Sequence, residues 1–178
     1  MGEDAQGSAQ VIGMLRADHG HIKDLMARLR SAADKAEQDR VLAELFLDLR
    51  ILSVLEQQFF YPSLAPVVDQ KQIAELGKEL YFMLTLMLEL ESTYASEAPL
   101  ESTLALLSER FEQHVHKDEG LFRQMEKWAV DWRSQLASMA DRMETYRIEL
   151  KQKLCRKLTD CRGESRFQPP FSIRRRCA

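Results

Sequence analysis

The sequence has little glycine, proline or cysteine. Only 7 Gly and 5 Pro interrupt 178 residues, and this composition is typical of a soluble, helix-rich protein. It contains no Gly-rich phosphate loop, dinucleotide-binding fingerprint or nucleophile elbow, so nothing in it favours the enzyme classes that depend on those motifs. The 3 cysteines all lie in the last 24 residues without C-x-x-C spacing, and they predict neither a zinc site nor a disulfide framework.

The sequence also lacks an obvious targeting or membrane segment. The first ten residues, MGEDAQGSAQ, have neither the basic nor the apolar region of a signal peptide. The longest apolar patch, residues 80–88, is interrupted by Thr85 and is too short to span a bilayer. We therefore expect a cytoplasmic protein with reduced thiols and no membrane association.

Charge is distributed unevenly along the chain. Residues 147–178 contain ten Lys or Arg and three acidic residues, a net of +7, so residues 1–146 carry −10 within the net charge of −3. This asymmetry indicates a protein-contact surface at the C-terminal end. A homodimer is a further option. Nucleic-acid binding is not favoured, because Arg174, Arg175 and Arg176 have no interleaved aromatic residues.

Apolar residues recur in steps of three and four along four stretches, the spacing of one helix face. The stretches are residues 10–33, 39–61, 68–94 and 100–125. Pro62 is expected to end the second helix, and Pro99 to precede the fourth. We predict an all-α protein built on an antiparallel up-down four-helix bundle. The predicted parts are a disordered leader at 1–9, the bundle at 10–126, an amphipathic helix at 127–160 and a disordered basic tail at 161–178.

The helix predicted at residues 127–160 has two interpretations. Its apolar positions also follow a three-four alternation, which suits either a helix lying against the bundle or a coiled-coil dimerisation arm. Met and Tyr at the seam specify an oligomeric state poorly, which favours the packed helix.

Four ionisable residues fall on apolar helix faces. The segment FEQHVHKDEGLF places His114 and Asp118 one helical turn apart on the stripe of the fourth helix. His19 lies on the stripe of the first helix, and Glu56 on that of the second. Imidazole and carboxylate groups in a bundle core suit iron, manganese or zinc, so these four residues are candidate metal ligands.

Other polar residues near these positions have simpler expected roles. His21, His116 and Glu119 are predicted to face solvent. Tyr61 and Tyr81 offer a phenol ligand or a hydrogen bond, although aromatic core packing is the favoured role for both.

Three segments carry a family resemblance: MLRADHGHIKDLMARL, LEQQFFYPSL and FEQHVHKDEGLF. Together they resemble the hemerythrin-like, HHE cation-binding domains over residues 11–125. The resemblance implies a helical bundle that binds iron, with oxygen or nitric oxide bound nearby, and that acts as a sensor or storage protein. It assigns ligand roles to His19, Glu56 and His114, with Asp118 or Glu119 as the second carboxylate.

The sequence departs from the family pattern at two positions. Leu52 stands where the resemblance places a histidine on the second helix, and the third helix has no histidine near Leu80. A full di-iron, oxygen-carrying centre is therefore not expected. Three interpretations are open: one metal held by His19, His114 and one or both carboxylates, a metal-free core of His–carboxylate pairs, or a hydrated polar end of the bundle.

We therefore expect a hemerythrin-like, non-enzymatic protein that binds or senses a metal, with iron as the expected ion. The alternative is a metal-free regulatory bundle that binds a protein such as a transcription factor or sigma factor. Enzymatic activity is left open, because a mononuclear iron site can activate oxygen, but no substrate is indicated.

Overall fold

The computed structural model describes residues 6–95, 100–128 and 133–160. Every regular element in those ranges is helical, which confirms the predicted all-α class. No helix in the described ranges has the length and apolar character needed to cross a membrane. The tail predicted at 161–178 and the first five residues of the disordered leader predicted at 1–9 lie outside the described residues, whereas residues 6–9 are helical.

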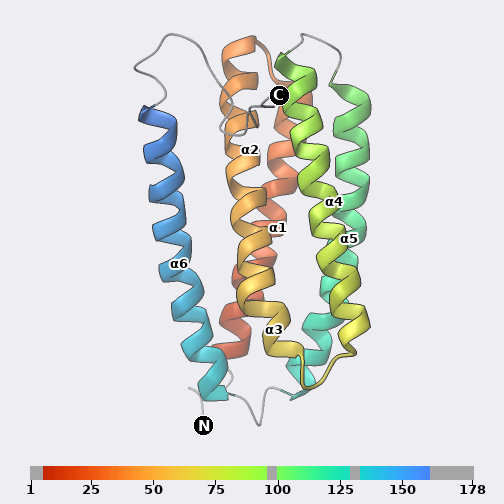
Figure 1. Cartoon of the computed structure of the whole chain (residues 1–178), viewed down its shortest axis with the longest axis vertical. Helices are drawn as coiled ribbons and strands as arrows, with labels where there is room; N and C mark the ends of the chain where they lie inside the picture. The colour runs from red at the N-terminus through yellow and green to blue at the C-terminus, as the bar shows by residue number, and fades with distance from the viewer. Residues whose placement is uncertain (1–5, 96–99, 129–132, 161–178) are drawn as a thin grey trace, which may run out of the picture.

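Long helices lie side by side along the longest axis of the molecule (Figure 1). In chain order the elements are α1 (Gln6–Ser31), α2 (Lys35–Leu55), the π-helical turn η1 (Glu56–Phe60), α3 (Tyr61–Leu64), α4 (Gln70–Ala95), α5 (Glu101–Trp128) and α6 (Arg133–Asp160). Helix α1 packs against α2 and α5, and α4 packs against α5 and α2. These four helices enclose the core.

Helix α6 lies outside that group, against α1 and α2 (Figure 1). Its apolar face contributes Leu136, Met139 and Met143 to the buried core. The arrangement agrees with the interpretation of the last helix as one that packs on the body.

The core is formed by the predicted apolar stripes. Leu15 and Ile22 of α1, Leu45 of α2 and Phe111 and Phe122 of α5 are among the fully buried side chains. Burial of large aliphatic and aromatic groups is the main favourable term in folding, at about 25 cal/mol per Å² of apolar surface.

The turn between α1 and α2 is held by reciprocal capping. The Asp34 carboxylate accepts a hydrogen bond from the backbone N–H of Glu37 at 2.8 Å, and the Glu37 carboxylate accepts one from the backbone N–H of Ala33 at 3.1 Å. Otherwise unpaired donors at the start of α2 are thereby satisfied. The tight turn lets α1 and α2 pack side by side.

Helix boundaries differ from the prediction in two places. Helix α1 begins at Gln6, four residues before the expected start. Pro62 does not end the second helix, because the chain passes through η1 and continues as α3 to Leu64. The prediction was wrong here because proline is tolerated in a first helical turn, where its missing N–H is not needed, and Pro62 stands at that position in α3.

Candidate metal centre

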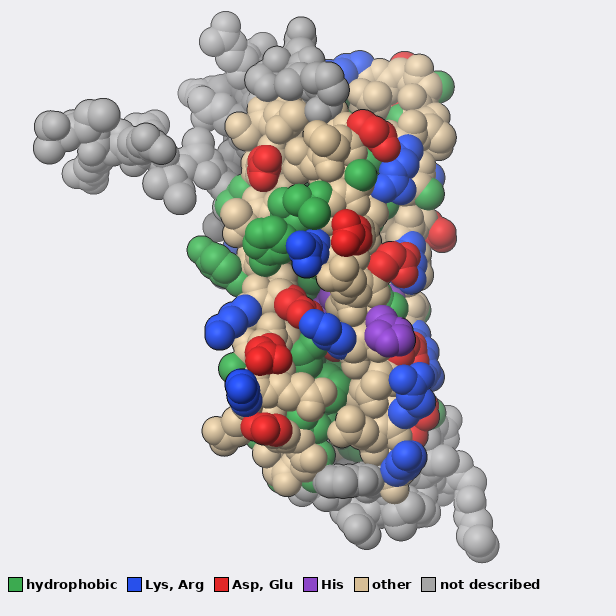
Figure 2. Space-filling view, turned by 90° about the vertical axis from the view of Figure 1, so that its right-hand side faces the viewer, with side chains coloured by type: hydrophobic (Ala, Val, Ile, Leu, Met, Phe, Trp, Pro, Cys, Tyr) green, Lys and Arg blue, Asp and Glu red, His purple; other side chains and the backbone are tan. Residues whose placement is uncertain are grey.

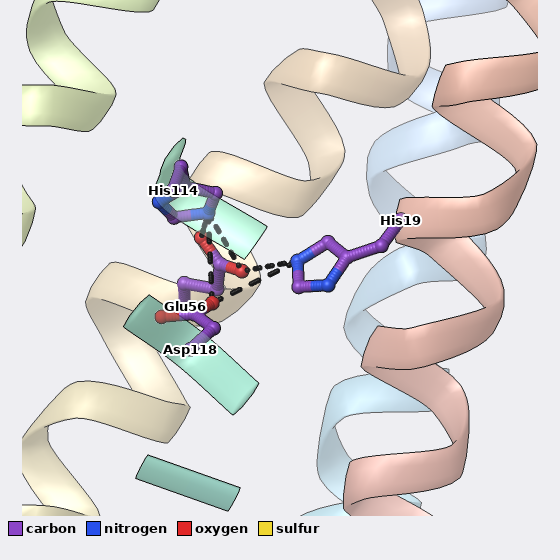
Figure 3. Close-up of side chains that lie close together, drawn as sticks. All are labelled: His19, Glu56, His114 and Asp118. Atoms are coloured by element: carbon purple, nitrogen blue, oxygen red, sulfur yellow. Dashed lines mark hydrogen bonds and ion pairs between the residues drawn. The ribbon is translucent and has the colours of Figure 1, made fainter. Parts of the chain in front are cut away.

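Four polar side chains from three separate segments meet in the core (Figure 3). His19 comes from α1, Glu56 opens η1, and His114 and Asp118 lie one turn apart on α5. His19 is 3% exposed, and the other three are fully buried. The structure therefore brings together all four residues that the sequence singled out.

Glu56 lies at the centre of this group. Its Oε1 is 3.2 Å from Nε2 of His19, and its Oε2 is 3.1 Å from Nε2 of His114. Asp118 Oδ2 completes the set, at 3.5 Å from Nε2 of His114 and 3.7 Å from Nε2 of His19. One nitrogen of each imidazole thus faces both carboxylates.

A π-helical turn adds a fifth group to the site. In an α-helix, residue i+5 lies about 140° around the axis from residue i. A π-turn instead places these two residues one above the other, and here the Tyr61 N–H donates to the Glu56 carbonyl. The Tyr61 hydroxyl lies 3.4 Å from Oε2 of Glu56 and 3.2 Å from Oδ1 of Asp118.

Aromatic rings fix the orientation of the histidines. The His19 ring meets Phe111 edge to face at 5.8 Å and stacks on Phe122 at 6.1 Å. The His114 ring lies 6.1 Å from Phe111 and 5.7 Å from His19. These ring contacts hold both Nε2 atoms toward the carboxylates. The Nδ1 atoms of both histidines are buried without a hydrogen-bond partner among the described residues.

The two carboxyl groups have opposite proton affinities. Burial would raise the pKa of Glu56, but the charge and hydrogen bond of His114 and the hydrogen bond of His19 outweigh it, so its pKa is lowered to about 2. Burial and the charge of Glu56 raise the pKa of Asp118 to about 10. Burial, followed by the charges of Glu56 and Asp118, raises the pKa of Tyr61. At neutral pH the metal-free site therefore holds an ionised Glu56 and a protonated Asp118.

The donor set fits a single divalent cation. The four ligand atoms lie within 4.8 Å of one another. Neighbouring ligands of a metal bound at about 2.1 Å are separated by about 3.0–3.4 Å, close to the separations at Glu56. Asp118 Oδ2 is buried without a hydrogen-bond partner among the described residues, and it lies 3.5 Å and 3.7 Å from the Nε2 atoms of His114 and His19.

The positions of the missing family ligands are apolar and buried. Leu52 lies one turn before Glu56, whose N–H donates to the Leu52 carbonyl, and its side chain is in the core. Leu80 on α4 is also buried.

The two tyrosines named as candidates have different positions. Tyr61 is buried in the core, as the sequence favoured, and its hydroxyl also donates a hydrogen bond to the site. The favoured role of Tyr81, core packing, is wrong, because its side chain is 73% exposed on α4. The apolar stripe of α4 runs through Leu80 and Met83, so the adjacent Tyr81 faces outward.

A second His–carboxylate group lies at the surface between α1 and α2. His21 Nε2 is 3.1 Å from Asp48 and 3.4 Å from Glu44. His21 and Glu44 are both well exposed, and Arg28 also approaches Glu44. Exposed ion pairing accounts for this group.

The remaining predicted solvent-face residues are placed as expected. His116 is exposed, and Glu119 lies near the surface, where it pairs with Arg16 at 2.7 Å.

An open hollow shares the Tyr61 side chain with the site. Its volume is about 400 Å³, and its walls are largely apolar, formed by Gln57, Tyr61, Pro62 and Ala65 together with Gln70, Ile73, Ala74 and Gly77. Tyr61 thus lines this hollow and also contacts the polar cluster.

Comparison with protein-family models finds the hemerythrin HHE cation-binding domain over residues 10–126. The chain belongs to the hemerythrin HHE cation-binding domain family. The match includes His19, Glu56, His114 and Asp118, so the buried cluster lies within the hemerythrin domain. Helix α6 lies beyond the matched residues. No curated protein and no solved structure matched the chain.

Proposed function

We propose that this hemerythrin-family protein binds one iron ion in an antiparallel up-down four-helix bundle and acts in the cytoplasm as a non-enzymatic iron-binding or iron-sensing protein. The observation that carries the proposal is the convergence of two imidazole nitrogens and two carboxylates, from three helical segments, in a fully buried site. Burying such groups is costly unless they are paired or bind a metal, so their presence needs a compensating partner.

One ion suits the ligand supply better than two. The site offers two nitrogen donors, and the positions where the family pattern places further histidines hold the buried Leu52 and Leu80. Two imidazoles with carboxylate oxygens and open positions form a donor set typical of mononuclear non-haem iron.

Each residue has a defined role in this proposal. His19 and His114 would bind through Nε2, because those nitrogens face the carboxylates. Glu56 would be the main oxygen ligand, since its pKa is lowered. Asp118 would become a ligand on releasing its proton to solvent as the cation binds. An iron ion with open coordination positions would supply a binding point for a small diatomic ligand such as oxygen or nitric oxide.

Metal analysis of the untagged protein tests the proposal. We expect near-stoichiometric iron in the wild type, or its uptake on anaerobic addition of Fe(II), and only background metal in a Glu56→Ala, His114→Ala double variant. His116→Ala is the matched control, because it removes an exposed histidine from the same helix. Background metal in the wild type under both conditions would overturn the proposal.

A metal-free regulatory protein is the second candidate, and one observation favours it. In the metal-free structure both imidazoles pair with Glu56, and the raised pKa of Asp118 keeps that group neutral, so the core is largely compensated without an ion. Such a protein would act through contacts with a protein such as a sigma factor or another transcription factor, by way of α6 and the basic tail. Background metal in the wild type together with an unchanged fold would support this second function.

A further inference from the structure

Helix α4 presents an exposed stripe of residues in addition to the face that it buries in the core. The stripe consists of residues spaced by four and three along the helix: Ala74, Lys78, Tyr81, Thr85, Leu88 and Ser92, all of them exposed. This alternation is the spacing of a seam between two long helices. It runs beside the separate apolar stripe that α4 buries in the core.

The middle of the stripe is unusually apolar for a surface. Tyr81 is 73% exposed and Leu88 is 47% exposed, and the adjacent Phe82 is 43% exposed beneath the Arg110 guanidinium at 5.5 Å. Figure 2 shows hydrophobic side chains gathered in the upper left of the face that contains α4 and α5. Grouped apolar side chains on an otherwise charged surface are typical of an interaction site.

Charges at the two ends of the stripe have opposite signs. Lys78 lies toward the start of α4 and Glu89 toward its end, and both are exposed. Within the described ranges neither has an ion-pair partner. Two parallel copies of α4 would place like charges together, whereas two antiparallel copies would place Lys78 of each beside Glu89 of the other.

Side-chain sizes match in the same antiparallel register. With the two-fold axis near residue 83, Tyr81 of one copy faces the small Thr85 of the other, and Ala74 faces Ser92. The apolar stem of Lys78 would lie along Leu88 of the other copy, and its ammonium group would reach Glu89 of that copy. Large side chains opposite small ones are what close helix packing requires.

We infer that this protein forms a homodimer through the outward face of α4, with the two helices antiparallel about a two-fold axis. The axis makes each contact occur twice, so the Lys78–Glu89 pair forms at both ends of the interface. The interface is separate from the buried cluster, and the inference does not depend on metal binding.

Charge reversal gives the sharpest test, because it distinguishes a second copy from an unrelated partner. The mass in solution of the full chain would be measured by sedimentation equilibrium over a wide range of protein and salt concentrations. We expect a dimer in the wild type. Lys78→Glu alone and Glu89→Lys alone should each weaken it by about tenfold, because two exposed ion pairs become two repulsive pairs. The Lys78→Glu, Glu89→Lys double variant should recover the wild-type affinity.

Leu88→Lys should abolish the dimer, because it places a second ammonium group beside Lys78 of the other copy, while Ile148→Lys on α6 is the matched control, because Ile148 is similarly exposed at 49%. The charge-reversed variants change only exposed residues, so circular dichroism should show an unchanged helical fold. A wild type with the mass of one chain at every concentration would overturn the inference. So would equal effects of Leu88→Lys and Ile148→Lys, or a double charge reversal that fails to restore association.

Discussion

The Tyr61 hydroxyl lies 3.2 Å from Oδ1 of Asp118, a residue 57 positions further along the chain. This contact joins the end of the π-helical turn to α5 and closes one side of the buried cluster. Both residues are 2% exposed or less. The raised pKa of Tyr61 keeps its proton in place, so the hydroxyl acts as a donor to the carboxyl groups.

Tyr61→Phe should weaken metal binding without abolishing it. The variant removes the donor to Asp118 Oδ1 and leaves a buried oxygen unsatisfied, which costs about 1–3 kcal/mol. We expect the free energy of unfolding to fall by that amount and the iron affinity to fall by about tenfold, both less than for loss of His114. Calorimetric titration with Fe(II) and urea denaturation would measure the two effects. Tyr81→Phe, at an exposed position, should change neither; an equal effect there would contradict the assigned role.

Asp118→Asn should stabilise the metal-free protein while removing metal binding. The folded-state pKa of Asp118 is raised to about 10, whereas an unfolded aspartate titrates near about 4. Between these values the folded state holds a proton that the unfolded state has lost. The free energy of unfolding of the metal-free wild type should therefore fall as pH rises through this window.

Asparagine does not titrate, so the variant should lose this part of the pH dependence. Urea denaturation from weakly acidic to weakly alkaline pH, in the presence of a chelator, would measure it. If the free energy of unfolding depends on pH in the same way in the wild type and the variant, then Asp118 is not protonated in the folded protein.

Leu52→His should increase iron affinity at the expense of metal-free stability. The residue lies one turn before Glu56 and is buried, so an imidazole there can point into the same region of the core. Without metal, the buried polar ring should cost about 2–3 kcal/mol. Leu52→Asn is the control, since it buries a polar group that binds iron poorly. No gain in iron uptake for the histidine variant would mean that Leu52 does not face the site.

Helix α6 should influence the metal site from outside. Its Tyr146 ring lies 5.5 Å from the ring of Phe59, and the Arg142 guanidinium lies 5.4 Å from the same ring, which belongs to the π-turn that Glu56 opens. Arg147 also forms a bidentate ion pair with Asp18, the residue before His19. Both ligand-bearing segments of the N-terminal half thus contact α6.

Tyr146→Ala should therefore lower iron affinity several-fold as well as reduce stability by about 1–2 kcal/mol. The affinity would be measured by titration with Fe(II), and the stability by urea denaturation. Ile148→Ala removes an exposed side chain from the same helix and should leave both quantities unchanged. If Tyr146→Ala lowers the stability but leaves the iron affinity unchanged, then α6 stabilises the bundle without positioning the metal site.

Periodicity explains why much of this protein could be predicted. The three-four alternation follows from 3.6 residues per helical turn, so it assigned His114 and Asp118 to the buried face before any helix was placed. The same argument put His19 and Glu56 on apolar faces, and all four side chains are buried. It also predicted that His116 would be exposed, as it is.

Periodicity misled where the local geometry was not α-helical. Regular α-helical spacing places Glu56 and Tyr61 on different sides of a helix, whereas the core packing favoured for the Tyr61 ring is confirmed by its burial. The π-turn brings them together, and it also carries the chain past Pro62. The aromatic character of Tyr81 suggested burial as well, yet its side chain lies on the outward face of α4.

The sequence by itself determined the helical class and the inward direction of the four polar residues, because both depend on the spacing of neighbours along one chain. Only the tertiary structure decided that the four residues lie at one height, that Tyr61 joins them, and that Glu56 is ionised while Asp118 keeps its proton. Those properties depend on distances between separate helices and on exclusion of water, because charge interactions become decisive only when the groups are close and buried.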